Sequence, residues 1–531
     1  MIYRSPFQEI DLPSRPLDEY ILEGASERGD HPALVDAASG RTITYAELAE
    51  LVGSVAAGLA DAGLKPGEVL AVYAPNSLFY PVACLAAARA GAAVTLVNAL
   101  ATAKDLARQL QDAEARILFT VSALLPTVRE AGGTVREVFV LDEAADHRSI
   151  GDLARSGAGR PAADAPRRSA DTALLPYSSG TSGAPKGVVL THGNVTANIA
   201  QMSHALEVTP DHRVLAVLPF FHAYGFSTLI GVTLRSGATL VVLPRFDLAG
   251  FLDVLTGQRI THALVAPPIA LALAKHPLVE GRDFSSIRQL LSAAAPLKPE
   301  LAEMVHRRIG VPVVQAYGMT ELSPGAHVPP RGQTPPPGSV GKPLPSTECR
   351  LVSPESGLDV APGAEGELWI RGPQVMRGYL GRPTETAEVV DEDGWLHTGD
   401  LARVDEDGWF FISDRVKELI KYKGYQVLPG ELEAVLLTHP GVADAAVVGV
   451  VDEDGMETPR AYVVAAPGAG GSGAGAALTA EAVMEYVAAR VAPYKKVRSV
   501  AFLDALPRSN AGKILRRELR NLAAGAGPAG S

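Results

Sequence analysis

Helical patterns alternate with short β-branched runs through the first 260 residues, and this alternation constrains the fold more than any other feature. The helical stretch "YAELAELVGSVAAGLADAGL" precedes "VLAVYAP", and "AKDLARQLQDAEA" precedes "RILFTV". Strands that alternate with helices of this length form βαβ units and parallel sheets. The sequence therefore predicts a large α/β body.

Further along the chain the pattern changes twice. Beyond about residue 335, "TPPPGSVGKPLPSTECRLVSPESG" and "GELWIRGPQVMRGYL" indicate short strands with dense turns, as in a small β-rich subdomain. A charged segment starts at Asp414, and an α+β pattern follows it. Because 531 residues are too many for one compact core, we expect an N-terminal domain over 1–413 and a small C-terminal α+β domain over 418–531, with the boundary at 414–417.

Charge and cysteine content narrow the class of protein. The net charge of −11 argues against nonspecific nucleic-acid binding, which needs a basic face. The two cysteines, Cys84 and Cys349, are too few for a disulfide framework and favour a reducing compartment. The most apolar stretch, "YPVACLAAARAGAAVTLV", is interrupted by Arg89 and Gly91, which predicts a buried helix and a strand rather than a membrane span. We expect a cytoplasmic monomer or weak homodimer that binds neither nucleic acid nor membranes.

The segment "YSSGTSGAPKGVVLTHGN" at 177–194 carries the pattern of a phosphate-binding loop. Hydroxyls, glycines that admit backbone N–H groups, and a lysine come together in Ser178, Ser179, Gly180, Thr181, Ser182, Gly183 and Lys186. The order of residues differs from that of the usual nucleotide-binding loop, G-x-x-x-x-G-K-[ST]. "VVL" predicts a strand, and Thr191 or Asn194 would cap the helix after it. A flexible Ser/Gly linker is the simpler alternative, but linkers rarely lie between two apolar runs.

This loop resembles the signature of the adenylate-forming superfamily, which includes acyl- and aryl-CoA synthetases, peptide-synthetase adenylation domains and luciferases. Other segments similar to those of the family follow in the family's order: "LPFFHAYG" (218–225), "QAYGMTE" (315–321), "GWLHTGDLARVDEDGWFFISDRVKELIKYKGYQV" (394–427) and "LPRSNAGKILRREL" (506–519). Within the superfamily the chain is most similar to 4-coumarate:CoA ligase-like enzymes, through "KELIKYKGYQV" and "GMTE".

The resemblance implies an acid–CoA ligase that uses ATP, Mg²⁺ and CoA. Such an enzyme joins a carboxylate to the α-phosphate of ATP, releases pyrophosphate and passes the acyl group to a thiol. Because carboxylate and triphosphate repel each other, the site must neutralise both. By resemblance, Lys186 acts at the β/γ-phosphates and Lys513 bridges the α-phosphate and the carboxylate. Taken alone, Lys513 would be a solvated lysine before the basic "LRRELR"; by resemblance it is also a candidate for regulatory acetylation.

The nucleotide residues are also carried by resemblance. Tyr317 would stack on adenine, next to Gly318, and Thr320 would contact the α-phosphate. Glu321, with Thr181 of the loop, would hold Mg²⁺. Asp400 and Arg415 would bind the ribose. Without the family pattern, Glu321 would be a surface glutamate and Asp400 an ordinary turn residue.

The segment after Asp414 is implied to serve the second half-reaction. Adenylation needs Lys513 in the site and thioester formation needs it removed, which a rotation about a hinge achieves. By resemblance, the hinge residue is Lys417, the residues entering in the second pose are Lys421 and Gln426, and the CoA-binding residues are Lys423, Gly424 and Arg245. A basic solvated helix over "VKELIKYKG" fits the same spacing.

The acid would lie in a slot walled by residues of the same motifs: His222, Tyr224, Thr228, Ala294, Gln315, Ala316, Gly318, Gly325 and Val328. A lone histidine among aromatics is more often a packed core residue than a catalyst, but by resemblance His222 gates the carboxylate. Small side chains leave a flat slot for a planar aryl or cinnamyl group. Coumarate ligases commonly have glycine in place of Ala316 and bulkier residues near Gly325.

Other activities stay open at this point. The alternatives are a medium-chain fatty acyl-CoA ligase, and a stand-alone adenylation enzyme that loads a carrier protein. A catalytically inactive nucleotide-binding protein would lack one of Lys186, Glu321, Asp400 and Lys513, and all four are present. No residue points to a luciferase-type oxygenase.

Overall fold

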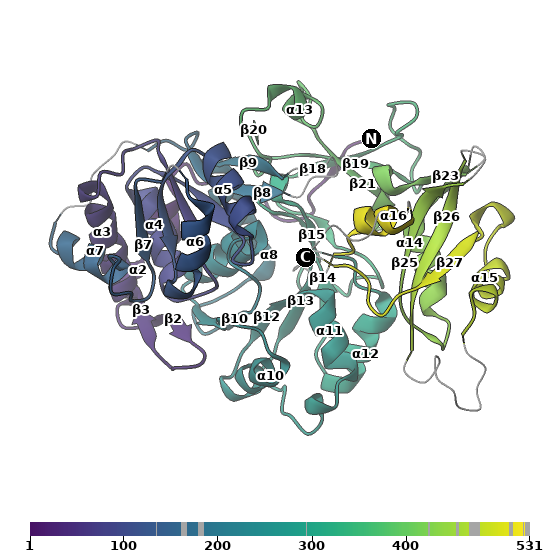
Figure 1. The fold of residues 1–531 in the computed structure, drawn as a ribbon, viewed down its shortest axis with the longest axis horizontal. Helices are drawn as coiled ribbons and strands as arrows, with labels where there is room; N and C mark the ends of the chain where they lie inside the picture. Colours follow the sequence, from purple (N-terminus) through teal and green to yellow (C-terminus); the bar gives the residue numbers. More distant parts are fainter. Residues whose placement is uncertain are drawn as a thin grey trace. The chain divides into compact units, whose positions relative to one another are not determined.

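The computed structural model of the protein describes residues 1–133, 135–160, 167–178, 185–293, 295–422, 425–452, 456–466, 478–508, 513–523 and Gly525. The chain divides into two compact units, each treated by itself below. The larger unit comprises Ile2–Cys349 and Ile370–His397, and the smaller comprises Met1, Arg350–Trp369 and Thr398–Ser531. Helices and strands alternate through the larger unit (Figure 1), so the predicted α/β class is confirmed. The domain boundary expected at 414–417 stays a prediction.

The first sheet of the larger unit has seven strands in the order β20-β9-β8-β5-β4-β6-β7. In that order the strands are Gly378–Tyr379, Lys186–Thr191, Thr172–Ser178, Ala93–Val97, Val69–Tyr73, Ala115–Thr120 and Glu137–Val140. Strands β4 to β8 form parallel pairs, as the βαβ pattern predicts. Strand β9 returns antiparallel to β8 and pairs with β20 on its other side. The hairpin β8–β9 therefore brings both ends of the predicted phosphate loop to one edge of the sheet.

Helices pack around this sheet. They are α3 (Tyr45–Asp61), α4 (Phe79–Arg89), α5 (Ala103–Asp112), α6 (Leu125–Ala131), α7 (Ile150–Gly157) and α8 (His192–Leu206). Alternate residues of β4, Ala71 and Tyr73, belong to one apolar cluster with side chains of α5 and α6. The apolar stretch expected to give a buried helix and a strand forms α4 and β5. Thr191 is the N-cap of α8, one of the two caps that the sequence predicts, and Asn194 completes a capping box with it.

A second seven-stranded sheet has the order β14-β13-β12-β10-β11-β2-β3. In that order the strands are Val313–Gln315, Gln289–Ser292, His262–Val265, Arg213–Ala216, Thr239–Val242, Pro32–Asp36 and Thr42–Thr44. Helices α10 (Leu248–Gly257), α11 (Pro267–Lys275) and α12 (Pro299–Ile309) contribute to its aliphatic core. A π-helix, η2 (Tyr224–Val232), continues into α9 (Thr233–Arg235). Short strands β15 (Tyr317–Gly318), β16 (Gly325–Val328) and β17 (Lys342–Pro343) form a small sheet.

The smaller unit is rich in β-structure, as the sequence beyond residue 335 predicts. Strands β18 (Glu348–Val352), β19 (Gly366–Arg371), β21 (Leu396–Val404) and β22 (Phe410–Arg415) lie side by side in that order. A second sheet joins β25 (Val442–Val451), β26 (Glu457–Ala465) and β27 (Ser499–Phe502). Helices α14 (Pro429–Leu437) and α15 (Ala480–Ala488) contribute to the core on this sheet. Leu519 of α16 (Arg516–Ala523) belongs to a second apolar cluster.

The charge spacing of 416–427 is compatible with a helix, but the described residues of this segment form a short 3₁₀ turn and two strands. Val416–Glu418 forms a short 3₁₀ turn, η5, and β23 (Ile420–Tyr422) pairs with β24 (Tyr425–Val427). The alternative of a basic solvated helix is therefore wrong, because Ile420 and Val427 are buried in the core of the unit as cross-strand partners.

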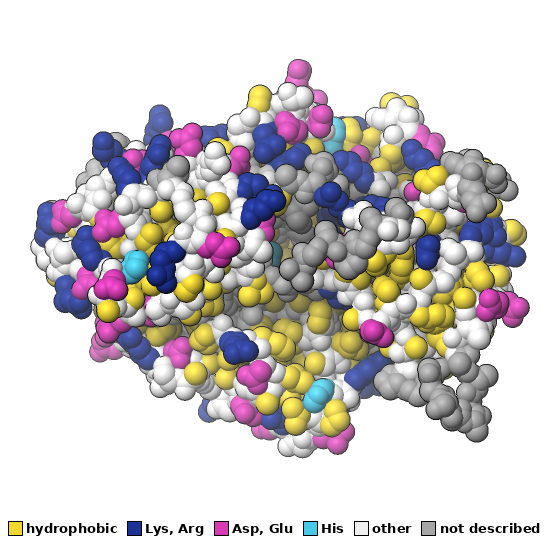
Figure 2. Space-filling view, in the orientation of Figure 1, with side chains coloured by type: hydrophobic (Ala, Val, Ile, Leu, Met, Phe, Trp, Pro, Cys, Tyr) yellow, Lys and Arg dark blue, Asp and Glu magenta, His cyan; other side chains and the backbone are white. Residues whose placement is uncertain are grey.

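Cys84 and Cys349 are both buried free thiols. Within the described ranges no helix has the length and apolarity that crossing a membrane requires. Figure 2 shows basic and acidic side chains interspersed over the visible face of the region that contains α3, α5 and α6.

Candidate functional site

The hairpin β8–β9 positions the ends of the phosphate loop. Ser178 ends β8 and Lys186 begins β9, and the two are cross-strand partners. The five predicted loop residues between them, Ser179, Gly180, Thr181, Ser182 and Gly183, lie outside the described residues. The ring of Tyr177 packs against Gly187, where an added Cβ would lie 3.1 Å from the ring. The sheet thus fixes the hydroxyl and the ammonium that bracket the loop.

Glu321 meets this hairpin from a distant part of the sequence. It lies on the 3₁₀ turn η4 (Thr320–Leu322) and is only 5% exposed. Its Oε1 accepts hydrogen bonds from the Ser178 hydroxyl and from the Tyr379 hydroxyl, each at 3.0 Å. The Nζ of Lys186 lies 4.9 Å from the centroid of the Tyr379 ring. The structure therefore brings together three predicted residues, Ser178, Lys186 and Glu321, around a tyrosine that the sequence reasoning missed.

Tyr379 lies in "VMRGYL". Neither the residue types in this stretch nor their spacing links Tyr379 to the phosphate loop. Burial raises the pKa of Tyr379 well above its usual range, and the neighbouring Glu321 carboxylate raises it further. The hydroxyl is therefore protonated at neutral pH and acts as a donor to Glu321. The only signal in the sequence is the strand pattern of 366–379, and this pattern does not indicate the strand with which Tyr379 pairs.

The predicted adenine and α-phosphate residues follow on β15 and η4. Tyr317 is half-buried, and its ring meets that of His327 edge to face at 5.7 Å. Burial lowers the pKa of His327 to about 3, so this ring is neutral. Gly318 lies where two backbones approach, because an added Cβ would lie 2.0 Å from the carbonyl oxygen of Pro324, which directly precedes β16. Thr320 begins η4 and so directly precedes Glu321.

His222 and Tyr224 flank the start of η2. The ring of His222 lies 4.2 Å from that of Phe221, and burial lowers its pKa to about 4. The imidazole is therefore neutral at physiological pH, which suits a positional role better than that of a charged ligand. The Tyr224 hydroxyl donates to the Leu291 carbonyl at 3.4 Å. Gly225 permits the turn, because a Cβ there would lie 2.0 Å from the Pro219 carbonyl oxygen. π-Helical turns such as η2 occur mainly at functional sites.

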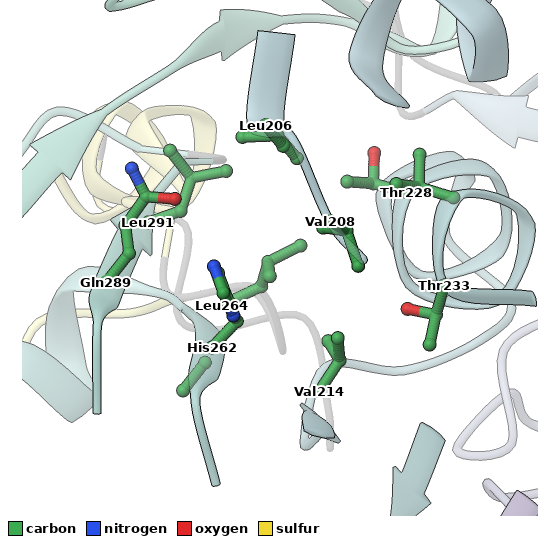
Figure 3. Close-up of a pocket in the computed structure, with 11 residues that line it drawn as sticks. Leu206, Val208, Val214, Thr228, Thr233, His262, Leu264, Gln289 and Leu291 are labelled. Atoms are coloured by element: carbon green, nitrogen blue, oxygen red, sulfur yellow. The ribbon is translucent and has the colours of Figure 1, made fainter. Parts of the chain in front are cut away.

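Thr228 lies one turn further along η2 and lines a small cavity (Figure 3). The cavity wall is otherwise mainly aliphatic, with Leu291 and Leu264 facing Thr228 from strands β13 and β12. Its volume is about 10 Å³, which is room for no more than one water molecule. The Thr228 side chain is 2% exposed and therefore faces a closed apolar space.

The other predicted acid-binding residues lie on β14 to β16, apart from one. Gln315 accepts a hydrogen bond from the Leu297 backbone N–H at 2.9 Å, and the Ala316 N–H donates to the Ser292 carbonyl at 3.0 Å. Gly325 and Val328 are buried on β16, and the Sδ of a methionine on α8 fills the space beside Gly325, 2.6 Å from an added Cβ. Ala294 lies outside the described residues.

In the smaller unit, the predicted ribose residues form a pair. Asp400 on β21 and Arg415 on β22 are cross-strand partners, and Arg415 Nε lies 3.0 Å from Asp400 Oδ1. Asp400 is 5% exposed, so the guanidinium partly compensates a carboxylate that is almost entirely removed from water.

The residues assigned to the hinge and to the second half-reaction occupy separate positions. Lys417 is exposed on η5, and Lys421 is exposed on β23, where its N–H donates to Glu457 at 2.8 Å. Lys421 and Gln426 are cross-strand partners in the hairpin. Lys513 is exposed before α16. Of the predicted CoA residues, Lys423 and Gly424 lie outside the described residues, and Arg245 is exposed after β11 in the larger unit.

The residues present fit a magnesium ion that arrives with phosphate. Among the described residues no cluster of three or more His, Cys, Asp or Glu side chains has the arrangement of a metal site. Mg²⁺ in nucleotide sites is commonly held by one or two carboxylates plus phosphate oxygens and water, rather than by an all-protein cage. Glu321 supplies one carboxylate beside the loop, and this single ligand matches that mode of binding.

Comparison with known proteins covers most of the chain. Residues 22–380 match the model of the AMP-binding enzyme family, and residues 431–513 match that of the AMP-binding enzyme C-terminal domain. The chain is 41% identical to 4-coumarate–CoA ligase-like 9 of Oryza sativa subsp. japonica, over 98% of this chain and 95% of that protein. It is 39% identical to 4-coumarate–CoA ligase 5 of the same organism, over 99% of this chain and 98% of that protein.

Solved structures give the same relationship. The model superposes on ATP-bound MatB from Rhodopseudomonas palustris with a TM-score of 0.86 and 30% identity, over 96% of this chain and 99% of that one. It superposes equally well on the anthranilate CoA ligase AuaEII in complex with anthranoyl-AMP, with a TM-score of 0.86 and 25% identity, over 97% of this chain and 99% of that one.

Proposed function

The chain belongs to the AMP-binding enzyme family and is an acid–thiol ligase, and from this premise we propose that it converts a hydrophobic aryl or cinnamate-type acid into its CoA thioester. In the first step a carboxylate oxygen attacks the α-phosphorus of ATP and pyrophosphate leaves. In the second step the CoA sulfur attacks the acyl carbon and AMP leaves. The observation that carries the proposal is the contact set of Lys186, Ser178 and Glu321 beside the phosphate loop.

The first step requires neutralisation of a polyanion, and the proposed roles follow from charge. Lys186 binds the β/γ-phosphates, where its ammonium offsets the charge that builds on the departing pyrophosphate. Glu321, together with Thr181, would hold Mg²⁺, which would supply positive charge to offset that of the phosphates. Lys513 contacts the α-phosphate and the attacking carboxylate. Lys186, Mg²⁺ and Lys513 would together lower the electrostatic repulsion between the carboxylate and ATP.

The nucleoside is held by two sets of groups in the proposal. Tyr317, whose ring is supported by a buried neutral imidazole, stacks on adenine beside Gly318, and Thr320 contacts the α-phosphate. Asp400 accepts hydrogen bonds from the ribose hydroxyls. Its existing pairing with Arg415 supports this role, because the guanidinium orients the Asp400 carboxylate.

The acid is proposed to lie against His222 and Tyr224, among the small residues of β14 to β16. An uncharged His222 leaves the acid's carboxylate free to move to the α-phosphate, whereas an imidazolium would hold it in an ion pair. The names of the relatives at about 40% identity support a coumarate-like substrate, and the structure of AuaEII with anthranoyl-AMP supports an aryl acid.

Transfer to CoA is proposed to follow a rotation about Lys417, which withdraws Lys513 and brings Lys421 and Gln426 to the acyl-adenylate. Their pairing across one hairpin supports joint movement. Arg245, Lys423 and Gly424 then bind CoA. In this proposal residues 1–413 form the body, 414–417 the hinge and 418–531 the moving domain.

Two measurements test the function. Pyrophosphate release is measured across a panel of benzoic, cinnamic and medium-chain fatty acids, followed by mass analysis for the CoA thioester. We expect release and thioester formation with cinnamic acids. Preference for fatty acids would move the substrate class to medium-chain acids, thioester-free release would favour carrier loading, and no release with any acid would refute the enzymatic proposal.

A variant separates the two half-reactions. Lys513→Ala is expected to lose pyrophosphate release but to convert a supplied acyl-adenylate to thioester at close to the wild-type rate. Equal loss of both steps would refute the two-pose mechanism, because Lys513 is assigned to the first step alone.

A further inference from the structure

We propose that Tyr379 is a positioning residue for adenylation: its hydroxyl orients the metal-binding carboxylate of Glu321, while its ring holds the ammonium of Lys186. The inference rests on the proposed function, because it takes ATP and Mg²⁺ as the ligands of these two groups. It assigns a role to a residue that no motif of the sequence analysis includes.

The backbone of Tyr379 is fixed to the same strand that carries Lys186. Gly378 and Tyr379 pair with Val189 and Val188 of β9, and the Leu380 N–H donates to the Gly187 carbonyl at 2.8 Å. The Tyr379 N–H donates to the Thr386 hydroxyl at 2.9 Å. These contacts hold the backbone of Tyr379 against the strand that begins with Lys186, so the ring lies close to Lys186.

The segment that contains Tyr379 also forms hydrogen bonds with Glu321 at two points. The Met376 N–H donates to the Glu321 backbone carbonyl at 2.8 Å, and the Tyr379 hydroxyl donates to Oε1 at 3.0 Å. A buried carboxylate with two hydroxyl donors on the same oxygen is restricted to one rotamer. The second carboxylate oxygen is thereby given a fixed orientation, which is what a metal ligand requires.

Tyr379 contacts two groups of opposite charge, the Lys186 ammonium through its ring and the Glu321 carboxylate through its hydroxyl. Among the residues that the structure describes, neither Lys186 nor Glu321 forms an ion pair, although both contact Tyr379. A direct Lys186–Glu321 pair would have to break before phosphate and metal bind. Tyr379 instead holds each group by a weaker contact, a cation–π interaction or a hydrogen bond, so both remain available to the ligand.

The test measures equilibrium binding of ATP with and without Mg²⁺ by calorimetry, in the absence of acid and CoA. Tyr379→Phe keeps the ring and removes the hydroxyl, so we expect the Kd of MgATP to rise about tenfold, the range for one hydrogen bond to a charged group, and the Kd of metal-free ATP to stay within twofold. Tyr379→Leu also removes the ring, so we expect the Kd of metal-free ATP to rise as well, about threefold. Ser178→Ala, which removes the other donor to Oε1, should act in the direction of Tyr379→Phe.

The matched control is Tyr177→Phe, which removes a phenol hydroxyl from the adjacent strand β8. That hydroxyl donates to Asp112 at 2.6 Å and contacts neither Glu321 nor Lys186, so both Kd values should stay within twofold of wild type. The proposal is overturned if Tyr379→Phe binds MgATP as wild type does, or if it loses MgATP and metal-free ATP equally, as a purely structural residue would. Absence of ATP binding to the wild-type protein would instead refute the proposed function.

Discussion

Replacing His192 with asparagine should reduce the loss of stability that the larger unit undergoes between pH 7 and pH 5. His192 is the first residue of α8 and is 2% exposed. Its Nδ1 accepts a hydrogen bond from the Leu17 N–H at 3.0 Å, which attaches the N-terminal segment to α8. Burial, and to a lesser extent the charge of Arg167, lower the pKa of His192 from 6.5 to about 4.

The sign and size of the effect follow from linkage. An imidazole with a lowered pKa is neutral in the folded protein while it takes up a proton in the unfolded chain, so stability falls as pH drops from about 6.5 to about 4. At about 1.36 kcal/mol per pKa unit, protonation of the unfolded chain at pH 5 costs about 2 kcal/mol. With an unfolding entropy of about 2.1 cal/mol/K per residue, this corresponds to about 2 to 3 °C in the Tm of a unit of this size.

The assay compares the difference in Tm between pH 7 and pH 5 in wild type and His192→Asn. The asparagine oxygen can still accept from the Leu17 N–H but does not titrate, so the pH difference should shrink by about 2 to 3 °C. Other buried histidines, such as His262 and His327, are present in both proteins and cancel in the comparison. His306→Asn, at an exposed position on α12, controls for the loss of an imidazole. An unchanged pH difference in His192→Asn would refute the assignment of a buried neutral imidazole.

Three further substitutions test other parts of the chain. Lys186→Met should lower acid-dependent pyrophosphate exchange by about 100-fold or more, the usual loss for one preorganised charge-stabilising group. Its Tm, measured by circular dichroism, should stay within about 1 °C of wild type. Exchange at the wild-type rate would contradict the role assigned to Lys186. Glu433→Gln should destabilise the smaller unit by about 3 kcal/mol in chemical unfolding, because it leaves the guanidinium of Arg516 buried without its main partner; a loss below about 1 kcal/mol would show that the pair is solvated. Gly318→Ala should weaken MgATP binding and lower the Tm, because the added Cβ would lie 2.0 Å from a backbone carbonyl oxygen. Gly257→Ala is the control and should be neutral, because no atom lies within 4 Å of its added Cβ. Equal effects of the two alanines would refute the close approach at Gly318.

The α/β class and several local features were predictable because they depend on short-range chemistry. Hydrophobic periodicity predicts the alternating helices and strands, and the Thr191–Asn194 capping box predicts the start of α8. The hairpin β23–β24 was not predictable from charge spacing, which fits a solvated helix equally well. Its strand geometry comes from tertiary packing, because Ile420 and Val427 are buried as partners in the core of the smaller unit.

The contact between Tyr379 and the phosphate loop was beyond sequence reasoning for a different reason. Tyr379 pairs with a strand almost two hundred residues earlier in the chain, and its hydroxyl reaches Glu321 on a third segment. Neither helical nor strand periodicity carries information on which distant edge a two-residue strand will join. Family resemblance located Lys186 and Glu321 separately, and only the sheet order shows that one side chain contacts both.

Within the smaller unit, charged pairs connect the segment after the proposed hinge to the segment that carries Lys513. Glu418 directly follows Lys417 and is paired with Arg520 of α16, and Arg516 at the start of that helix is paired with Glu433 of α14. The Arg516 Nε also lies 3.9 Å from Glu418. These pairs join α14, α16 and the residue after Lys417, and α16 begins three residues after Lys513. In the proposed mechanism, a rotation about Lys417 would therefore carry Lys513 together with α14 and α16, without a separate rearrangement of the lysine.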